Sequence, residues 1–216
     1  MSPRHGALLG GALAVASCAS HRHHGHHKDD ARHGVEHWLH LDDPGRDAWQ
    51  KPDEVVAAAE LSEGQVVADV GAGTGYFEPF LSRAVGARGK VLALDVSPQL
   101  VEHMKRRFAE GSLGNVEVRL AQGDDPGLAA GSVDRVLVID TWHHLGDRVE
   151  YARRLKRALA PQGRVLVVDY TAEATQGPPP ELRLGVETVL AELREAGFTA
   201  RVLPETLPHQ FIVVAQ

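Results

Sequence analysis

Apolar residues follow two alternating patterns along most of the chain. Short continuous runs of Val, Leu, Ile and Ala are typical of strands that are buried on both faces of a parallel sheet. The longer stretches between them place apolar residues at helical spacing, which predicts amphipathic helices. The predicted strands are Val66–Val70, Lys90–Asp95, Val116–Ala121, Val133–Ile139, Arg164–Asp169, Ala200–Leu203 and Gln210–Ala215. The predicted helices are Lys51–Leu61, Tyr76–Val85, Pro98–Glu110, Arg148–Leu159 and Glu181–Ala196.

The alternation of strands and helices predicts right-handed crossover units and a doubly wound α/β fold. The last two strands are joined by residues 204–209 alone. That connection is too short for a crossover helix, so these two strands should pair antiparallel. We therefore expect a Rossmann-like, seven-stranded sheet with one antiparallel strand near its edge and helices on both faces. Residues 46–216 are long enough for one such domain.

The N-terminal residues have the features of an export signal. The apolar segment Gly6–Ser17 is shorter than the roughly 20 residues that a membrane-spanning helix needs. The residues Val15-Ala16-Ser17-Cys18 resemble the lipobox of bacterial lipoproteins. That resemblance implies a signal peptide over residues 1–17 and a lipid anchor on Cys18, which would place the protein in the cell envelope with no other membrane contact. The alternative is an uncleaved N-terminus on a cytoplasmic protein.

A histidine-rich tether is predicted over residues 18–45. Nine of the 13 histidines precede Asp43, and the segment has too little apolar area to offset the entropy of ordering it. The His21–His27 run could bind transition metals loosely. His33, His37 and His40 would share one face of a helix, but Gly34 weakens that helix, so we predict no ordered metal site.

Charge argues against a nucleic-acid partner. The net charge is −6, and Lys and Arg are scattered along the chain. A protein that binds a phosphate backbone needs a concentrated basic surface, which this pattern does not provide.

A glycine-rich turn carries the strongest functional signal. The predicted strand Val66–Val70 leads into Gly71-Ala72-Gly73-Thr74-Gly75, and a helix follows. Glycine allows a sharp turn and a close approach by a ligand. A dinucleotide fingerprint needs a small residue at the position that Tyr76 occupies. The motif Asp69-Val70-Gly71-Ala72-Gly73-Thr74-Gly75 instead resembles motif I of class I S-adenosylmethionine-dependent methyltransferases.

That resemblance covers nearly the whole domain and implies roles for several acids. Gly71, Ala72, Gly73 and Gly75 would pass beneath the methionine part of the cofactor, and Asp69 would order its amino group. Asp95, followed by Val96, ends the second strand, where a carboxylate can accept both ribose hydroxyls. Asp124 or Asp125 would face the adenine amino group, and we favour Asp124. The alternative is that both acids only stabilise a turn.

The segment after the fourth strand resembles motif IV of the same family. Asp140 would shape the pocket floor near the methionine moiety. Either His143 or His144 could be a catalytic base or contact the acceptor, since histidine accepts protons near neutral pH. Alternatively, the two histidines cap the next helix or pack under the loop. Trp49 and Gln50 either close the pocket or anchor the first helix.

These features predict a methyltransferase that uses S-adenosylmethionine to modify a small-molecule acceptor by in-line transfer. Two alternatives stay open at this point. The chain could be a lipoprotein that keeps the fold but only binds S-adenosylmethionine or S-adenosylhomocysteine, or only scavenges metal. It could also be an NAD-dependent oxidoreductase, against which Tyr76 and the antiparallel closing strands argue.

Overall fold

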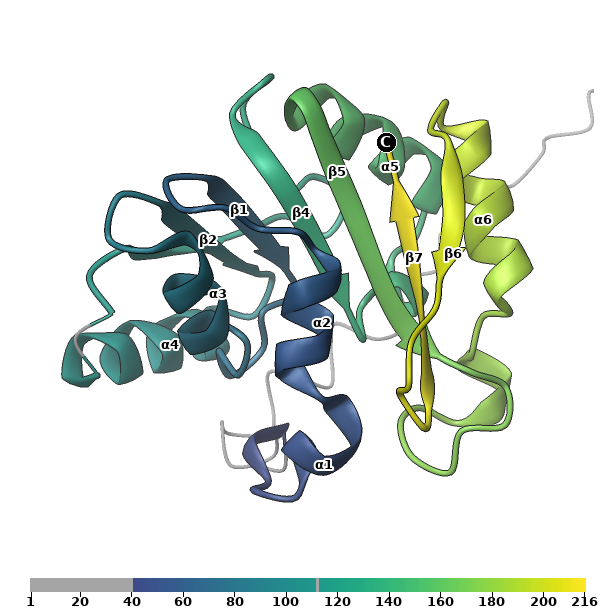
Figure 1. The fold of residues 1–216 in the computed structure, drawn as a ribbon, viewed down its shortest axis with the longest axis horizontal. Coiled ribbons are helices and arrows are strands. Elements are labelled where there is room, and N and C mark those ends of the chain that lie inside the picture. The colour runs from purple at the N-terminus through teal and green to yellow at the C-terminus, as the bar shows by residue number, and fades with distance from the viewer. Residues whose placement is uncertain (1–40, 112) are drawn as a thin grey trace, which may run out of the picture.

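The computed structural model describes residues 41–111 and 113–216 (Figure 1). The signal peptide, Cys18, the His21–His27 run and the triplet of His33, His37 and His40 lie outside these residues, so the statements about them stay predictions. Within the described residues, no helix is long and apolar enough to cross a membrane.

Seven strands of the described chain form one sheet in the order β3-β2-β1-β4-β5-β7-β6. β7 runs antiparallel to both of its neighbours, and the other pairs of adjacent strands are parallel. The fold prediction is therefore confirmed. The strands are β1 Val66–Val70, β2 Lys90–Asp95, β3 Val116–Leu120, β4 Val133–Ile139, β5 Leu159–Tyr170, β6 Ala200–Leu203 and β7 Gln210–Ala215.

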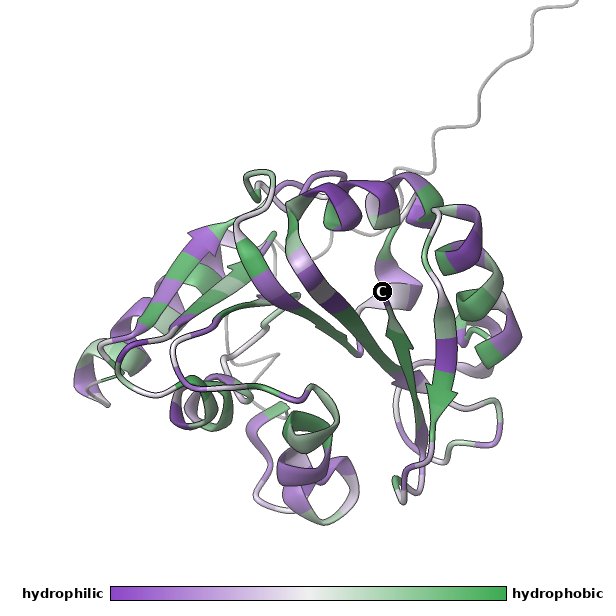
Figure 2. Cartoon of the chain, turned by 45° about the horizontal axis from the view of Figure 1, so that its top comes forward, coloured by the Kyte–Doolittle hydropathy of each residue, from purple (hydrophilic) through white to green (hydrophobic). Residues whose placement is uncertain are grey.

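Helices cover both faces of the sheet, as Figure 1 shows. On one face, Val55 of α2 and Leu81 of α3 pack against strand residues such as Val67. On the other, Leu155 of α5 and Leu193 of α6 pack against the opposite side of the strands. Figure 2 shows hydrophobic strands between helices that turn their polar sides outward. The helices are α1 Arg46–Gln50, α2 Pro52–Ala58, α3 Glu78–Val85, α4 Pro98–Glu110, α5 Arg148–Ala158 and α6 Val186–Glu195, with short 3-10 turns η3 Trp142–His144 and η4 Pro180–Leu182.

The first predicted helix corresponds to α2, and the short helix α1, which was not predicted, precedes it. Lys51 separates α1 from α2 and has a φ of 45°, in the left-handed region. Pro52 explains the break, because a proline disfavours the right-handed helical conformation of the residue before it. α2 begins one residue later and ends three residues earlier than the predicted helix Lys51–Leu61.

Two other boundaries differ from the prediction by five residues each. β5 begins at Leu159 rather than Arg164, and its register against β4 shifts where Gln162 takes a φ of 66°. The last helix begins at Val186, after η4, rather than at Glu181. The prolines that precede η4 favour an extended chain, which shortens the helix.

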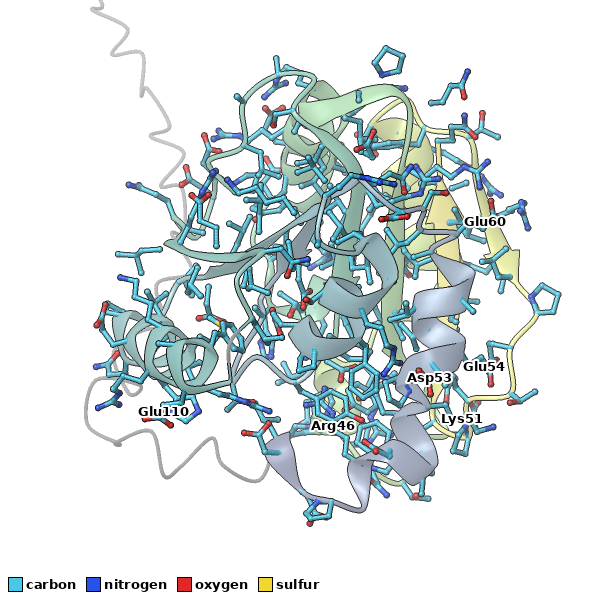
Figure 3. The ribbon with its side chains drawn as sticks, turned by 60° about the vertical axis from the view of Figure 1, so that its left-hand side comes forward. Arg46, Lys51, Asp53, Glu54, Glu60 and Glu110 are labelled. Carbon is cyan, nitrogen blue, oxygen red and sulfur yellow. The ribbon has the colours of Figure 1, made fainter. Side chains whose placement is uncertain are left out.

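The first two helices are tied across the carboxyl ends of the parallel strands. Lys51 Nζ donates to the carbonyl oxygen of Thr206 at 2.5 Å, and Glu54 Oε1 accepts from the Thr206 N–H at 2.6 Å (Figure 3). Upstream, Asp42 Oδ1 accepts from Thr74 at 2.9 Å and from Arg107 at 3.0 Å. Asp42, near the end of the predicted tether, therefore already contacts the domain.

Candidate active site

The glycine turn after β1 lies where the strand order reverses, between β1 and β4, which is where open α/β sheets bind ligands. Gly71 and Gly75 have φ values of +79° and +85°. A Cβ atom on Gly71 would lie 2.2 Å from the hydroxyl oxygen of Thr141, and one on Gly75 would lie 2.4 Å from the ring of Phe108. Both positions therefore require glycine, and the turn is packed between α4 and the segment after β4.

Asp95, at the end of β2, holds the glycine turn in place. Its Oδ2 accepts the Gly73 N–H at 2.9 Å, and its Oδ1 accepts the Ser97 N–H at 2.8 Å. The side chain is buried, while the neighbouring Val96 is exposed. An ionised carboxylate has about four acceptor positions, which is the chemistry that binding the two hydroxyls of a diol requires.

The two acids after β3 have different surroundings. Asp125 accepts from the Gly127 N–H at 2.8 Å and pairs with Arg154 of α5 at 2.9 Å. Asp125 therefore does stabilise the turn, as the alternative interpretation held for both acids. Asp124 is exposed beside it. The prediction that Asp124 faces adenine stays a prediction.

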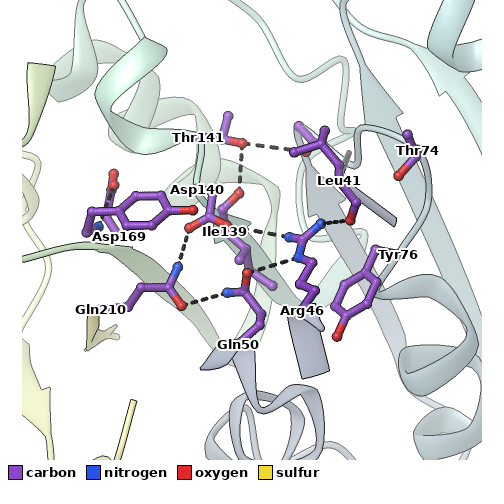
Figure 4. A network of polar contacts seen from close by, with 12 residues as sticks. Leu41, Arg46, Gln50, Thr74, Tyr76, Ile139, Asp140, Thr141, Asp169 and Gln210 are labelled. Atoms are coloured by element: carbon purple, nitrogen blue, oxygen red, sulfur yellow. Dashed lines mark hydrogen bonds and ion pairs between the residues drawn. The ribbon is translucent and has the colours of Figure 1, made fainter. Parts of the chain in front are cut away.

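A closed ring of polar contacts lies beyond the carboxyl end of β4 (Figure 4). Arg46 donates to Gln50 Oε1 at 3.1 Å, and Gln50 donates to Gln210 Oε1 at 2.7 Å. Gln210 donates to Asp140, which also pairs with the Arg46 guanidinium at 3.5 Å. Asp140 itself has a φ of 54°, which is uncommon for a residue with a side chain.

The ring joins α1, β7 and the end of β4 into one unit. Burial raises the pKa of Asp140 to about 7, even though Arg46 opposes that shift. Gln50 is fully buried in the ring, and Trp49 is half-buried with its ring 6.2 Å from those of Tyr170 and His209. These contacts anchor α1, and the prediction that the pair closes the pocket stays a prediction.

The two candidate histidines lie in η3 and differ in exposure. The His143 side chain is 2% exposed, and its Nδ1 lies 2.8 Å from Oδ1 of Asp169, which is fully buried. The His143 N–H also donates to Asp169, at 3.1 Å. His144 is exposed, and its ring centroid lies 4.1 Å from that of His143. Neither histidine caps α5, because the side chain of Asp147 does so.

Sequence reasoning missed Arg46, Gln210, Asp169 and Glu78 as site residues. Asp169 could have been found, because an acid at the carboxyl end of a buried predicted strand is the same signal that identified Asp95. Glu78 offered no signal, because an acid in the first turn of a helix is common for electrostatic reasons.

Two buried acids lie beside the glycine turn. Asp69 of β1 is 3% exposed, and Glu78, the first residue of α3, is 0% exposed. Burial raises the pKa of both carboxyl groups above the ordinary range and is the largest cause of the shift. The nearby Asp69 raises the pKa of Glu78 further. Arg46 counteracts the shift at Asp69, and Arg107 does so at Glu78.

This arrangement makes folding stability depend on pH. The carboxyl pKa values in the folded chain lie above those of the unfolded chain, so the folded state binds more protons, and stability falls as pH rises through the folded values. Glu78→Gln should therefore become more stable relative to wild type between pH 5 and pH 8, by about 1–3 kcal/mol, since each pKa unit is worth about 1.4 kcal/mol.

Urea unfolding across that pH range measures the effect. Glu187→Gln is the matched control, because Glu187 also lies in the first turn of a helix but is exposed. We expect the control curve to stay parallel to that of wild type. A Glu78→Gln curve that is equally parallel would contradict the prediction.

Comparisons with known proteins agree with this geometry. A family model described as "Methyltransferase domain" matches residues 67–163. A solved S-adenosylmethionine-dependent methyltransferase from Aquifex aeolicus is 32% identical, with a TM-score of 0.80 over 85% of this chain and 98% of that one.

Two curated relatives are similar over shorter segments. Nocamycin O-methyltransferase of Saccharothrix syringae is 33% identical over 139 residues, which are 64% of this chain and 46% of the relative. A ubiquinone/menaquinone biosynthesis C-methyltransferase of Klebsiella pneumoniae subsp. pneumoniae is 28% identical over 112 residues, 51% of this chain and 45% of the relative. These matches thus span about half the length of the curated relatives.

The chain belongs to the S-adenosylmethionine-dependent methyltransferases, and its cofactor is S-adenosylmethionine. The residues at the site fit that molecule. The turn has no side chain at Gly71, Gly73 or Gly75, Asp95 can accept from ribose hydroxyls, and the buried acids suit a cationic group. The dinucleotide alternative is thereby set aside.

Proposed function

We propose that this protein transfers the methyl group of S-adenosylmethionine to a small-molecule acceptor that carries a dissociable proton, and that His143 accepts that proton. The observation that carries this proposal is the contact of His143 with the buried Asp169 at the end of the sheet where the glycine turn lies. Such a pair is the usual means of holding a histidine as a base.

Asp169 fixes the orientation and tautomer of the histidine. An ionised carboxylate can only accept hydrogen bonds, so the Nδ1 atom of His143 carries the hydrogen in their contact. The Nε2 atom of the neutral ring is then the atom with a free lone pair. The second bond, from the His143 backbone N–H to Asp169, holds the whole residue in place.

The segment that carries His143 contacts the glycine turn. Thr141 directly precedes η3, and its hydroxyl lies 3.5 Å from the carbonyl oxygen of Gly71. When bound, S-adenosylmethionine supplies a methyl group on a positively charged sulfur. The chain's main task is to hold the acceptor in line with that methyl group, because correct alignment supplies much of the rate enhancement.

Aromatic residues beside His143 favour a small acceptor with a flat apolar surface. The ring of Tyr170 lies 6.4 Å from that of His143, and Trp49 lies next to Tyr170. The printed names of the relatives, which include an O-methyltransferase for nocamycin and a C-methyltransferase of quinone biosynthesis, also support small acceptors. The even charge distribution argues against a nucleic-acid acceptor.

An acceptor screen with the full-length chain tests the proposal. The panel contains phenols, enolisable ketones, carboxylic acids and amines, with transfer followed by mass spectrometry and binding of S-adenosylhomocysteine followed by calorimetry. We expect methylation of at least one phenol or enol. Binding of the nucleoside without methylation of any compound would contradict the proposal and favour the non-catalytic alternative.

A further inference from the structure

Glu78, one of the two buried acids next to the glycine turn, has an unusual lack of partners. Neither carboxyl oxygen of Glu78 accepts a hydrogen bond from another residue of the described chain, and both are inaccessible to solvent. Buried carboxyl groups are ordinarily hydrogen-bonded, since leaving one unpaired is costly. The carboxyl of Asp69 is its neighbour, and two carboxyls bond to each other only when one of them carries a proton.

The surrounding charges do not neutralise this pair. Two cations of the described residues face it, Arg46 and Arg107. Arg46 is engaged by Asp140, Gln50 and the Leu41 carbonyl, and Arg107 by Asp42 and the Thr74 carbonyl.

Two further acids, Asp95 and Asp140, lie close enough to repel a charge on Asp69. Within residues 41–111 and 113–216, this edge of the sheet therefore holds more carboxyl groups than cations around the pair. The repulsion between these carboxyl groups is lowered either by a proton or by a bound cation.

We propose that Asp69 and Glu78 share one proton in the free protein and release it to solvent when the ammonium group of the cofactor's methionine end binds between them. Glu78 is then a second acidic residue of the cofactor site. The ammonium N–H groups donate to both carboxylates and so replace the hydrogen bond that the shared proton made. The local charge is unchanged, because the released proton and the bound ammonium group each carry one positive charge. The inference rests on the identity of the cofactor and not on the acceptor or on His143.

The chemistry of the cofactor decides which part of it meets the pair. Its nucleoside end presents hydroxyl groups and a neutral base, for which Asp95 is the suitable acceptor. Its methionine end carries the ammonium group, and a cation is the ligand that a buried carboxyl pair favours. Asp69 and Glu78 flank the glycine turn on the α3 side, at the end of β1 and the start of α3.

Calorimetry on the full-length chain tests the proposal. S-adenosylhomocysteine is titrated at about pH 6, where its amino group is already protonated because free α-amino groups have pKa values near 8. Repeating the titration in buffers of different ionisation enthalpy counts the protons released. We expect close to one proton per bound ligand in wild type and a markedly smaller number in Glu78→Gln.

A truncated ligand locates the effect. 5′-Methylthioadenosine has the nucleoside and the sulfur but no amino-acid part. We expect Glu78→Gln to weaken S-adenosylhomocysteine binding about 10- to 100-fold and to change 5′-methylthioadenosine binding less than about twofold. Asp95→Asn, which removes the acceptor for the ribose hydroxyls, should weaken both ligands.

Three results would overturn the inference. The first is the absence of proton release in wild type, which needs no variant and is unaffected by misfolding. The second is equal release in wild type and Glu78→Gln, which would assign the proton to another group such as Asp140. The third is equal weakening of both ligands by Glu78→Gln. None of these measurements involves an acceptor, so failure of the methyl-transfer proposal would be seen separately.

Discussion

Replacing His143 with glutamine is expected to lower kcat for methyl transfer about 10²- to 10⁴-fold, the range that general acid–base groups contribute. Glutamine keeps a polar group beside Asp169 but cannot accept a proton. The affinity for S-adenosylmethionine should stay within about twofold of wild type, because His143 bonds to Asp169 rather than to the glycine turn. Rate and binding are measured separately, by steady-state kinetics and by calorimetry.

Two companion variants separate a chemical role from a structural one. Asp169→Asn should also lower kcat, because an amide group can donate to Nδ1 and favours the wrong tautomer. His144→Gln should have a much smaller effect, because the His144 side chain is exposed rather than buried beside Asp169 as His143 is. If His144→Gln lowers kcat more than His143→Gln does, the assignment of the base is wrong.

Asp95→Ala is expected to weaken S-adenosylhomocysteine binding about 10- to 100-fold. The substitution removes the acceptor for the ribose hydroxyls, and a hydrogen bond to a charged group is worth about 1.5–3 kcal/mol. It also leaves the N–H groups of Gly73 and Ser97 without their acceptor, so the glycine turn loses its anchor.

Ser97→Ala provides the control for Asp95→Ala. The Ser97 side chain accepts the Leu100 N–H and caps α4, so its loss should cost roughly 1 kcal/mol of stability without a change in affinity. Titration calorimetry and thermal unfolding measure the two properties. Affinities that fall equally in both variants would show that Asp95 acts only through the local fold.

The sequence predicted the sheet and its ligand-binding edge because these depend on local patterns. Uninterrupted apolar runs fixed the strands, and the short segment before β7 predicted its antiparallel direction. Gly71 and Gly75 were identified because left-handed backbone favours glycine. Asp95 was found because it ends a predicted parallel strand, and Asp140 because its segment resembles motif IV.

The rest of the site depends on contacts between distant parts of the chain. The ring that holds Asp140 joins Arg46 and Gln50 of α1 to Gln210 of β7, and no local pattern reports such a contact. The pairing of His143 with Asp169 likewise connects η3 to the following strand. The start of α2 could be predicted because Pro52 restricts Lys51, but the short helix α1 before it was not predicted.

A crystal structure of the full-length chain with S-adenosylhomocysteine tests most directly the claim that the glycine turn and Asp95 form the cofactor site. We predict that the nucleoside lies along Gly71–Gly75, with both ribose hydroxyls within about 3.2 Å of the Asp95 carboxylate. A ligand bound away from this turn, or bound there with its ribose turned from Asp95, would contradict that claim.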